Sequence, residues 1–342
     1  MKRTLTFVAA LVVLASATFA QDNNNRRPRR ERPSQVTYDQ VHTHDPVMAK
    51  EGDTYYLFAT GMGVSVMSSK DMKTWKFEKS VLEKAPEWAT KLIPSYRGHT
   101  WAPDVIFHNG LWHVFYSCSA FAKNTSAIGV ATTPTLNPNS PDYKWTDHGM
   151  VIQSVPNRDM WNAIDPNIIV DEVGTPWMNF GSFWDGIKMV KLTPDMKSVA
   201  QPEEWVSLSR RERTFELDDA NPGDGAVEAP FIMKHGDYYY LFVSFDYCCR
   251  GKRSDYKVVV GRSKTVKGPY LDKEGKRMDK GGGSIVIQGN ENWAGIGHNS
   301  AYHFDGKDYF ICHAYSLAEN GASKLFIREM QWDAEGWPIV NW

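Results

Sequence analysis

The sequence predicts an all-β fold, and more specifically a five-bladed β-propeller. A hairpin recurs five times along the chain, each copy with a polar residue, an apolar run, a glycine turn and an aromatic-rich run. The copies begin at Asp45, Asp104, Asp165, Glu228 and Asn299, which leaves room for two further strands in each repeat. Helical periodicity is nearly absent, and residues 85–92 are the best helix candidate. Four short strands per repeat without long helices are typical of a propeller.

Residues 226–245, AVEAPFIMKHGDYYYLFVSF, show the repeat most clearly. Two apolar runs flank the turn at Gly236 and Asp237, which indicates a β-hairpin. Glu228 stands where the first strand begins, between Val227 and Ala229. A buried carboxylate in apolar surroundings is costly, so its presence favours a functional role.

The intervals between hairpins contain further strand candidates. Third strands are expected at residues 64–68, 127–132, 187–192, 257–262 and 324–330. Turns into fourth strands are expected at residues 69–75, 192–198 and 262–270. A β-sandwich is the alternative architecture, but it gives no reason for polar residues to recur in phase at strand starts.

Propeller geometry has a direct consequence for the polar residues that open the hairpins. The first strand of each blade lines the central channel, so its first residues converge at one mouth of that channel. The predicted pocket therefore collects Asp45, Asp104, Asp165, Glu228 and the pair His298 and Asn299.

Several carboxyl groups in one pocket are expected to have different pKa values, so that one can act as an acid and another as a base. Burial and like charges raise the pKa of a carboxyl group, and glycoside hydrolysis needs one protonated and one ionised carboxyl. Glu228, with apolar neighbours, is the candidate acid, whereas Asp45, after His44, is the candidate base. Asp165 is the third member, which would raise the proton affinity of Glu228 and hold substrate. Strand capping is the structural alternative for each, and it is the interpretation adopted for Asp104, which would hold neighbouring loops.

Composition and termini limit the class of protein. The 342 residues carry a formal net charge of -1, which argues against nucleic acid or an anionic membrane as partner. Residues 1–20 have a basic start, an apolar stretch and an A-x-A-like end, which indicates a signal peptide, with an uncleaved anchor as the alternative. Residues 21–35 are predicted to be a disordered polar linker, and residues 36–342 the propeller. We therefore expect an exported monomer, periplasmic or secreted, with no membrane contact after signal cleavage.

The four cysteines do not form a disulfide framework or a zinc site. Cys248 and Cys249 are adjacent, and in an exported protein they would form a vicinal disulfide or remain free thiols. Cys118 and Cys312 lie in strand-like runs and are expected to be buried apolar residues.

Seven short motifs, taken in order, resemble those of a known enzyme family. They are HDP at 44–46, WAPDV at 101–105, NAIDP at 162–166, GSFW at 181–184, VEAP at 227–230, CCRG at 248–251 and GHNS at 297–300. Together they cover nearly all of residues 36–342 and resemble glycoside hydrolase family 43, and within it the endo-α-1,5-L-arabinanases. The family is a five-bladed propeller, as the repeat predicts.

The resemblance implies an inverting hydrolase of arabinan. Asp45 matches the general base, Glu228 the general acid, and Asp165 the carboxylate that tunes the acid and orients the substrate. Sugar contacts are implied along two of the motifs and at three further positions. These residues are Asn162, Ala163, Ile164, Ser182, Phe183 and Trp184, with Trp101 and Phe121 stacking on sugar rings and Gly129 approaching through its backbone. Core packing is the alternative for Trp101 and Phe121, and a plain strand glycine for Gly129.

The resemblance also implies one calcium ion held by His298 on the channel axis, with water completing its shell. Calcium prefers oxygen donors, so a single imidazole is an unusual protein ligand for it. The ion would hold the pocket and its waters and would not act as the Lewis acid.

Three functions are compatible with these residues. The first is endo-hydrolysis of arabinan or arabino-oligosaccharides, favoured by CCRG and by a chain that ends just after the fifth blade. The second is an exo-acting α-L-arabinofuranosidase or β-xylosidase on the same scaffold. The third is a propeller that binds polysaccharide without cleaving it, which the three carboxylates argue against.

Overall fold

The computed structural model describes residues 33–212 and 223–342. The predicted signal peptide and most of the predicted linker lie outside these residues, and the first strand begins at Gln35. Among the described residues, no helix combines the length and the apolar character that crossing a bilayer requires.

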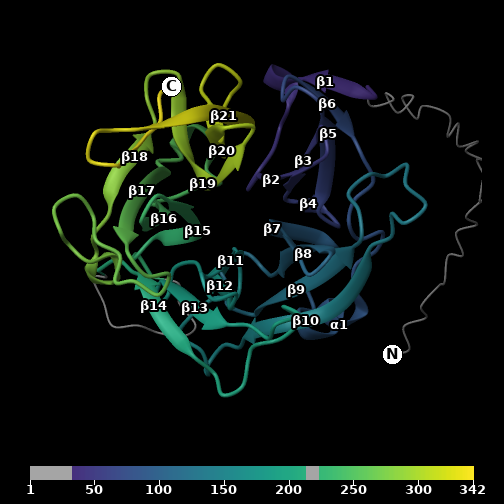
Figure 1. Cartoon of the computed structure of the whole chain (residues 1–342), viewed down its shortest axis with the longest axis horizontal. Helices are drawn as coiled ribbons and strands as arrows, with labels where there is room; N and C mark the ends of the chain where they lie inside the picture. The colour runs from purple at the N-terminus through teal and green to yellow at the C-terminus, as the bar shows by residue number, and fades with distance from the viewer. Residues whose placement is uncertain (1–32, 213–222) are drawn as a thin grey trace, which may run out of the picture. The chain divides into compact units, whose positions relative to one another are not determined.

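Five antiparallel sheets make up the fold, and Figure 1 shows them arranged around a common centre. The strand orders are β1-β6-β5-β3-β2, β10-β9-β8-β7-β4, β11-β12-β13-β14, β15-β16-β17-β18 and β19-β20-β21-β22. Successive strands pair within each sheet, as in propeller blades. The predicted five-bladed propeller is confirmed, and the β-sandwich alternative is excluded.

Each blade has its innermost strand at the centre of Figure 1 and its second strand beside it. The innermost strands are β2 (Val47–Glu51), β7 (His99–His108), β11 (Asn167–Val170), β15 (Val227–His235) and β19 (Trp293–Phe304). The second strands are β3 (Thr54–Ala59), β8 (Leu111–Cys118), β12 (Pro176–Phe180), β16 (Tyr238–Phe245) and β20 (Lys307–Ser316). These five pairs are the hairpins that the sequence repeat predicts.

The outer half of each blade contains the third and fourth strands. The third strands are β5 (Ser65–Ser69), β9 (Ser126–Thr133), β13 (Ile187–Lys191), β17 (Lys257–Ser263) and β21 (Ala322–Trp332). The fourth strands are β6 (Thr74–Phe77), β10 (Thr146–Ser154), β14 (Trp205–Ser209), β18 (Ser284–Gln288) and β22 (Pro338–Ile339). In the fourth blade the last strand starts well beyond the predicted turn at 262–270, because the chain first forms bridges from Leu271 to Arg262 and Arg277.

A few elements lie outside this plan. Strand β1 (Gln35–Thr37) pairs with β6, and β4 (Gly61–Met62) pairs with β7. The predicted helix at 85–92 is confirmed as α1 (Glu87–Leu92), the one α-helix in the described part of the chain. Within residues 33–212 and 223–342, three 3₁₀ helices span Tyr38–Gln40, Gly251–Arg253 and Met278–Lys280.

The ring closes by packing between the first and fifth blades. One core cluster combines Met48 and Leu57 of the first blade with Ile311 and Leu325 of the fifth. The Leu325 N–H also donates to the Val41 carbonyl at 3.1 Å. Apolar burial together with a main-chain bond joins the two ends of the propeller.

Polar side chains on the inner strands tie neighbouring blades together. Asp104 Oδ2 of β7 accepts from the Ile168 N–H of β11 at 2.6 Å. Asn167 Oδ1 accepts from the Ile232 N–H of β15 at 2.9 Å, and the Ser300 hydroxyl of β19 donates to the Pro46 carbonyl at 2.9 Å. The predicted structural role of Asp104 is confirmed, although it links strands of adjacent blades and not loops.

Candidate active site

In every blade one residue with left-handed backbone geometry lies just before the inner strand or within its N-terminal half. These residues are Asp45 (φ 55°), Ala102 (φ 34°), Asp165 (φ 58°), Ala229 (φ 55°) and His298 (φ 51°). Such backbone conformations are unfavourable for residues other than glycine, and they cluster at functional sites. The converging starts of the inner strands are therefore the candidate site.

Side chains of the preceding blade hold these residues in place. The Ala102, Asp165 and His298 N–H groups donate to hydroxyl oxygens at the ends of the preceding second strands. The acceptors are Thr60 at 2.8 Å, Ser117 at 3.1 Å and Ser244 at 2.8 Å, respectively. The Asp45 N–H donates to His313 Nδ1 of the fifth blade at 3.1 Å. Strain in the inner backbone is thus balanced by bonds between blades.

The third blade departs from this pattern. The corresponding residue is Gly181, which has no side chain to accept a bond and lies with φ 134° close to the Gly186 carbonyl. The Ala229 N–H of the next blade instead donates to Asp165 Oδ2 at 3.2 Å. The Asp165 carboxylate therefore takes over a bond that hydroxyls or an imidazole make elsewhere.

Asp45 lies among imidazoles. Its Oδ1 is 3.0 Å from His298 Nδ1, 3.7 Å from His313 Nδ1 and 3.9 Å from His44 Nδ1. The Thr60 hydroxyl donates to its other oxygen. Burial alone would raise the pKa of Asp45, but His298, followed by His44 and His313, brings it below its usual range. Asp45 is therefore ionised at neutral pH.

Glu228 lies among hydroxyl groups. Ser182 donates to Oε2 and Tyr256 donates to Oε1, each at 2.7 Å. Burial raises the pKa of Glu228 above its usual range, and the two hydroxyl donors only partly offset this effect. Tyr256 fits beside Glu228 because Gly297 has no Cβ, which would lie 2.2 Å from the tyrosine ring.

The pKa values of Asp165 and His298 depend on the charges of both Asp45 and Glu228. Burial raises the pKa of Asp165 to about 8, and the charges of Glu228 and Asp45 add to the increase. Burial would lower the pKa of His298, but Asp45, Asp165 and Glu228 together raise it to about 9. The three predicted carboxylates and His298 therefore form one coupled cluster.

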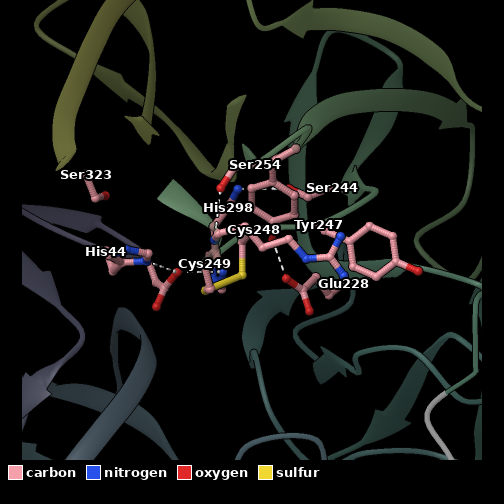
Figure 2. Close-up of a disulfide and its surroundings, with 12 residues drawn as sticks. His44, Glu228, Ser244, Tyr247, Cys248, Cys249, Ser254, His298 and Ser323 are labelled. Atoms are coloured by element: carbon pink, nitrogen blue, oxygen red, sulfur yellow. Dashed lines mark hydrogen bonds and ion pairs between the residues drawn. A yellow bond between two sulfur atoms is a disulfide. The ribbon is translucent and has the colours of Figure 1, made fainter. Parts of the chain in front are cut away.

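The vicinal cysteines lie next to this cluster. Cys248 and Cys249 are joined by a disulfide in the loop between β16 and β17, whereas Cys118 and Cys312 are buried free thiols, as predicted. Figure 2 shows the disulfide with His44, Glu228 and His298 among the surrounding side chains.

A metal ion has two sets of possible ligands here. His44, Asp45 and His313 offer ligand atoms within 4.8 Å of one another, which is the spacing of a His/Asp metal cluster. Both His313 nitrogens already have hydrogen-bond partners, however, in the Asp45 N–H and the Tyr315 hydroxyl. His298, the predicted calcium ligand, has Nδ1 next to Asp45, which leaves Nε2. One nitrogen suits calcium only if water supplies the remaining ligands.

The other predicted contact residues occupy different environments. Asn162, Ala163 and Ile164 are buried just before Asp165, and the Asn162 side-chain oxygen has no hydrogen-bond partner among the described residues. Phe121 is 76% exposed on the loop between β8 and β9. Gly129 lies on β9, where an added Cβ would meet the rings of Tyr116 and Trp88.

Of the remaining predicted residues, Ser182 and Phe183 lie beside Glu228. Ser182 bonds to Glu228, and the Phe183 N–H donates to the Val227 carbonyl at 2.9 Å. Trp184 is 3% exposed. Trp101 directly precedes Ala102 on β7, and its indole N–H donates to His99 Nδ1 at 3.1 Å.

Sequence reasoning missed several residues that contact the carboxylates. Tyr256 and Thr60 bond to Glu228 and Asp45, and His44 and His313 surround Asp45. His44 was visible in the HDP motif, and Thr60 follows the second strand at the place that Ser117 takes in the next blade. Tyr256 has no such signal, because its position depends on a long loop.

Two buried carboxyls whose pKa values are shifted in opposite directions match what glycoside hydrolysis needs, one acid and one base. The sequence model of glycosyl hydrolases family 43 matches residues 39–338. This chain belongs to that family.

Individual relatives agree with the family assignment. The chain is 55% identical over 302 residues to an extracellular exo-α-(1→5)-L-arabinofuranosidase of Cellvibrio japonicus, covering 88% of this chain and 87% of the relative. It is 40% identical over 299 residues to extracellular endo-α-(1→5)-L-arabinanase 1 of Bacillus subtilis, covering 86% of each. The solved structure of the Cellvibrio cellulosa α-L-arabinanase complexed with arabinohexaose superimposes with a TM-score of 0.86 at 54% identity, covering 88% of this chain and 96% of that one.

Proposed function

We propose that this protein hydrolyses α-1,5-L-arabinofuranosidic linkages in arabinan and arabino-oligosaccharides. The observation that supports this most directly is the contrast between Asp45, whose pKa the surrounding imidazoles lower, and Glu228, whose pKa burial raises. The names of the relatives at 55% and 40% identity supply the substrate class. Both are described as extracellular, which supports the expectation of an exported protein.

The reaction is a single displacement. Asp45 accepts a proton from water as that water attacks the anomeric carbon, and Glu228 donates its proton to the departing glycosidic oxygen. The water proton ends on Asp45 and the acid proton on the alcohol product, so the charges balance. An inverting enzyme of this kind holds its base and acid roughly 6.5–9.5 Å apart to admit the water, and this separation stays a prediction.

Asp165 tunes the acid in this proposal. Asp165 and Glu228 repel one another when both are ionised, so each raises the pH at which the other loses its proton. The Ala229 N–H on Asp165 also fixes the main chain beside Glu228. Asp165 is thereby suited to orient both the acid and the substrate.

The substrate contacts remain part of the proposal. Phe121, exposed on its loop, and Trp101, next to the left-handed Ala102, are assigned to stacking on arabinofuranose rings. The segment that contains Asn162 and the Ser182–Phe183 pair is assigned to polar and apolar sugar contacts beside the carboxylates. Gly129 is assigned only a backbone approach.

Cleavage within the chain and cleavage from its end are separate forms of this proposal. The motifs favour endo action, whereas the relative at 55% identity is named an exo enzyme. The early products from linear arabinan separate the two. Endo action yields a ladder of oligosaccharides from the first minutes, and exo action yields one short product from the start.

Calcium at His298 is a further part of the proposal. His298 Nε2 would hold the ion, with water as the other ligands, so the imidazole would bind it in its neutral form with the remaining proton on Nδ1 toward Asp45. The ion would then supply the positive charge that the imidazolium carries without it. After dialysis against a chelator, calorimetric titration with CaCl₂ should show one ion bound per wild-type chain and none to His298→Ala. Equal binding by the two proteins would remove His298 as a ligand.

Replacement of the acid tests the catalytic assignment. Glu228→Gln keeps the shape and the Ser182 contact but has no proton to donate, so kcat on linear arabinan should fall about 10²–10⁴-fold, the contribution typical of general acid catalysis. Binding of arabino-oligosaccharide, measured by calorimetry, should stay within about threefold of wild type, since the variant keeps the binding surface. Wild-type turnover by this variant would exclude Glu228 as the acid.

A further inference from the structure

His313 differs from the residues at corresponding positions in the other blades. Thr60, Ser117 and Ser244 each use a hydroxyl to accept an N–H from the next blade, whereas His313 uses imidazole Nδ1 to accept the Asp45 N–H. A hydroxyl would suffice to close the ring. The imidazole has a second nitrogen, and the side chain is fully buried.

The hydrogen-bond partners fix the protons of this imidazole. Because the Asp45 N–H can only donate, His313 Nδ1 must be the acceptor. A neutral imidazole then carries its proton on Nε2, which lies 3.1 Å from the Tyr315 hydroxyl and donates to it. His44 packs against the same ring, with centroids 4.3 Å apart, and restricts its rotation.

Tyr315 connects His313 to the vicinal disulfide. The Cys249 N–H donates to the Tyr315 oxygen at 2.9 Å, and the Tyr315 hydroxyl points toward Cys249 Sγ at 3.9 Å. The disulfide closes a small ring across adjacent residues, which limits the backbone freedom of Cys248 and Cys249. Tyr315 is 2% exposed, so water does not compete for these bonds.

We propose that the Cys248–Cys249 disulfide, Tyr315 and His313 form a relay that positions the general base Asp45. This inference rests on the proposed function, because it assigns these residues to the same reaction. The relay is continuous from the disulfide loop to the Asp45 main chain, and each of its bonds has one possible direction. Tyr315 and His313 are positioning residues, since they act on the reaction through Asp45.

The relay matters because Asp45 has a left-handed backbone, with φ 55°. If its N–H loses a fixed acceptor, the residue can relax toward a more favourable conformation and its carboxylate moves relative to the attacking water. Small displacements of a reacting group lower turnover strongly, whereas substrate binding by the rest of the site is unaffected.

Removal of the Tyr315 hydroxyl is the primary test. Tyr315→Phe should lower kcat on linear arabinan by about 5- to 50-fold with KM within about twofold of wild type. Tyr270→Phe is the matched control, because Tyr270 is also buried and its hydroxyl donates to the Val266 carbonyl at 2.7 Å in the fourth blade. The control should lose stability without losing kcat. Unchanged kcat in Tyr315→Phe, or an equal loss in both variants, would overturn the relay.

A double-mutant cycle tests whether the disulfide acts through Tyr315. Cys248→Ala/Cys249→Ala should lower kcat, and adding Tyr315→Phe should cause little further loss, because the two changes break the same connection. Multiplicative losses would show independent effects and would overturn the connection between the disulfide and Asp45.

A spectroscopic measurement separates this inference from the proposed function. The ¹⁵N signals of His313, assigned by their absence in His313→Ser, should show the neutral form protonated on Nε2, whatever the substrate. A form protonated on Nδ1 would overturn the relay even in an active enzyme. Wild-type protein that fails to cleave linear arabinan, but shows the Nε2-protonated form, would overturn the proposed function and leave the hydrogen-bonded chain established.

Discussion

The general base and the general acid of the site contact different kinds of side chain. Asp45 meets imidazoles from the first and fifth blades, whereas Glu228 meets the hydroxyls of Ser182 and Tyr256. Both carboxyls are largely withdrawn from water, so burial alone would raise both pKa values. Among the described residues, Asp45 alone of the two has a cationic side chain, His298, in direct contact.

The difference shows how one pocket shifts the pKa values of two buried carboxyls in opposite directions. A cation in contact stabilises the ionised form by enough to overcome desolvation, whereas neutral hydroxyl donors stabilise it less. The charge of the partner, more than the depth of burial, decides which residue is the acid.

The largest expected effect is on kcat, and it distinguishes the base from the acid when substrates with a poor and a good leaving group are compared. Asp45→Asn should lower kcat at least about 10³-fold on arabinan and on an aryl α-L-arabinofuranoside alike, because both need an activated water. Glu228→Gln should lose activity on arabinan but keep much of it on the aryl substrate, whose phenolate departs without protonation. If both variants lose the same fraction of kcat on the aryl substrate, the assignment of base and acid is wrong.

A moderate effect is expected when the acid end loses a hydrogen bond. The Ser182 hydroxyl stabilises ionised Glu228, so Ser182→Ala should raise the pKa of Glu228. The alkaline limb of kcat/KM reports the acid in the free enzyme and should therefore move to higher pH, by about one unit for a bond to a charged group.

The control for this shift is Ser119→Ala, which removes another buried hydroxyl, bonded to Ser126 in the second blade. Its pH profile should match that of the wild type. An alkaline limb that stays in place or moves to lower pH in Ser182→Ala would show that Ser182 does not stabilise the charge on Glu228.

The fold and the three carboxylates were predictable because the repeat and propeller closure together fix them. Once five hairpins stand in one ring, Asp45, Asp165 and Glu228 must approach the axis. The partners that set their pKa values were not predictable in this way. Tyr256 comes from a long loop and His313 from the fifth blade, and their approach depends on tertiary packing that no local pattern encodes.

The phase of the repeat was also only approximately predictable. Alignment of the five repeats makes Asp104 equivalent to Asp45. Strand pairing instead makes Ala102 the equivalent of Asp45, because Asp104 pairs with Phe115 as Val47 pairs with Phe58. Bulges between Trp101 and Asp104 and between Glu228 and Phe231 shift the register. A bulge changes the count by one residue without a clear sequence signal.

Asp104 is therefore a buried carboxyl that takes no part in the reaction. Its replacement gives the smallest expected effect, a pH-dependent change in thermal stability. Burial raises its pKa to about 7 from an ordinary value of 3.8. Since the folded state holds the proton more tightly than the unfolded state, this group lowers stability as pH rises from about 4 to about 7, with no further change above. Asp104→Asn keeps an oxygen for the Ile168 N–H and removes the titration, so its thermal midpoint relative to wild type should rise by a few degrees across that window. Its kcat should match that of the wild type throughout.

A constant difference in thermal midpoint would show that Asp104 stays ionised when folded, and would mean that burial without a cationic partner is not sufficient to keep a carboxyl protonated here.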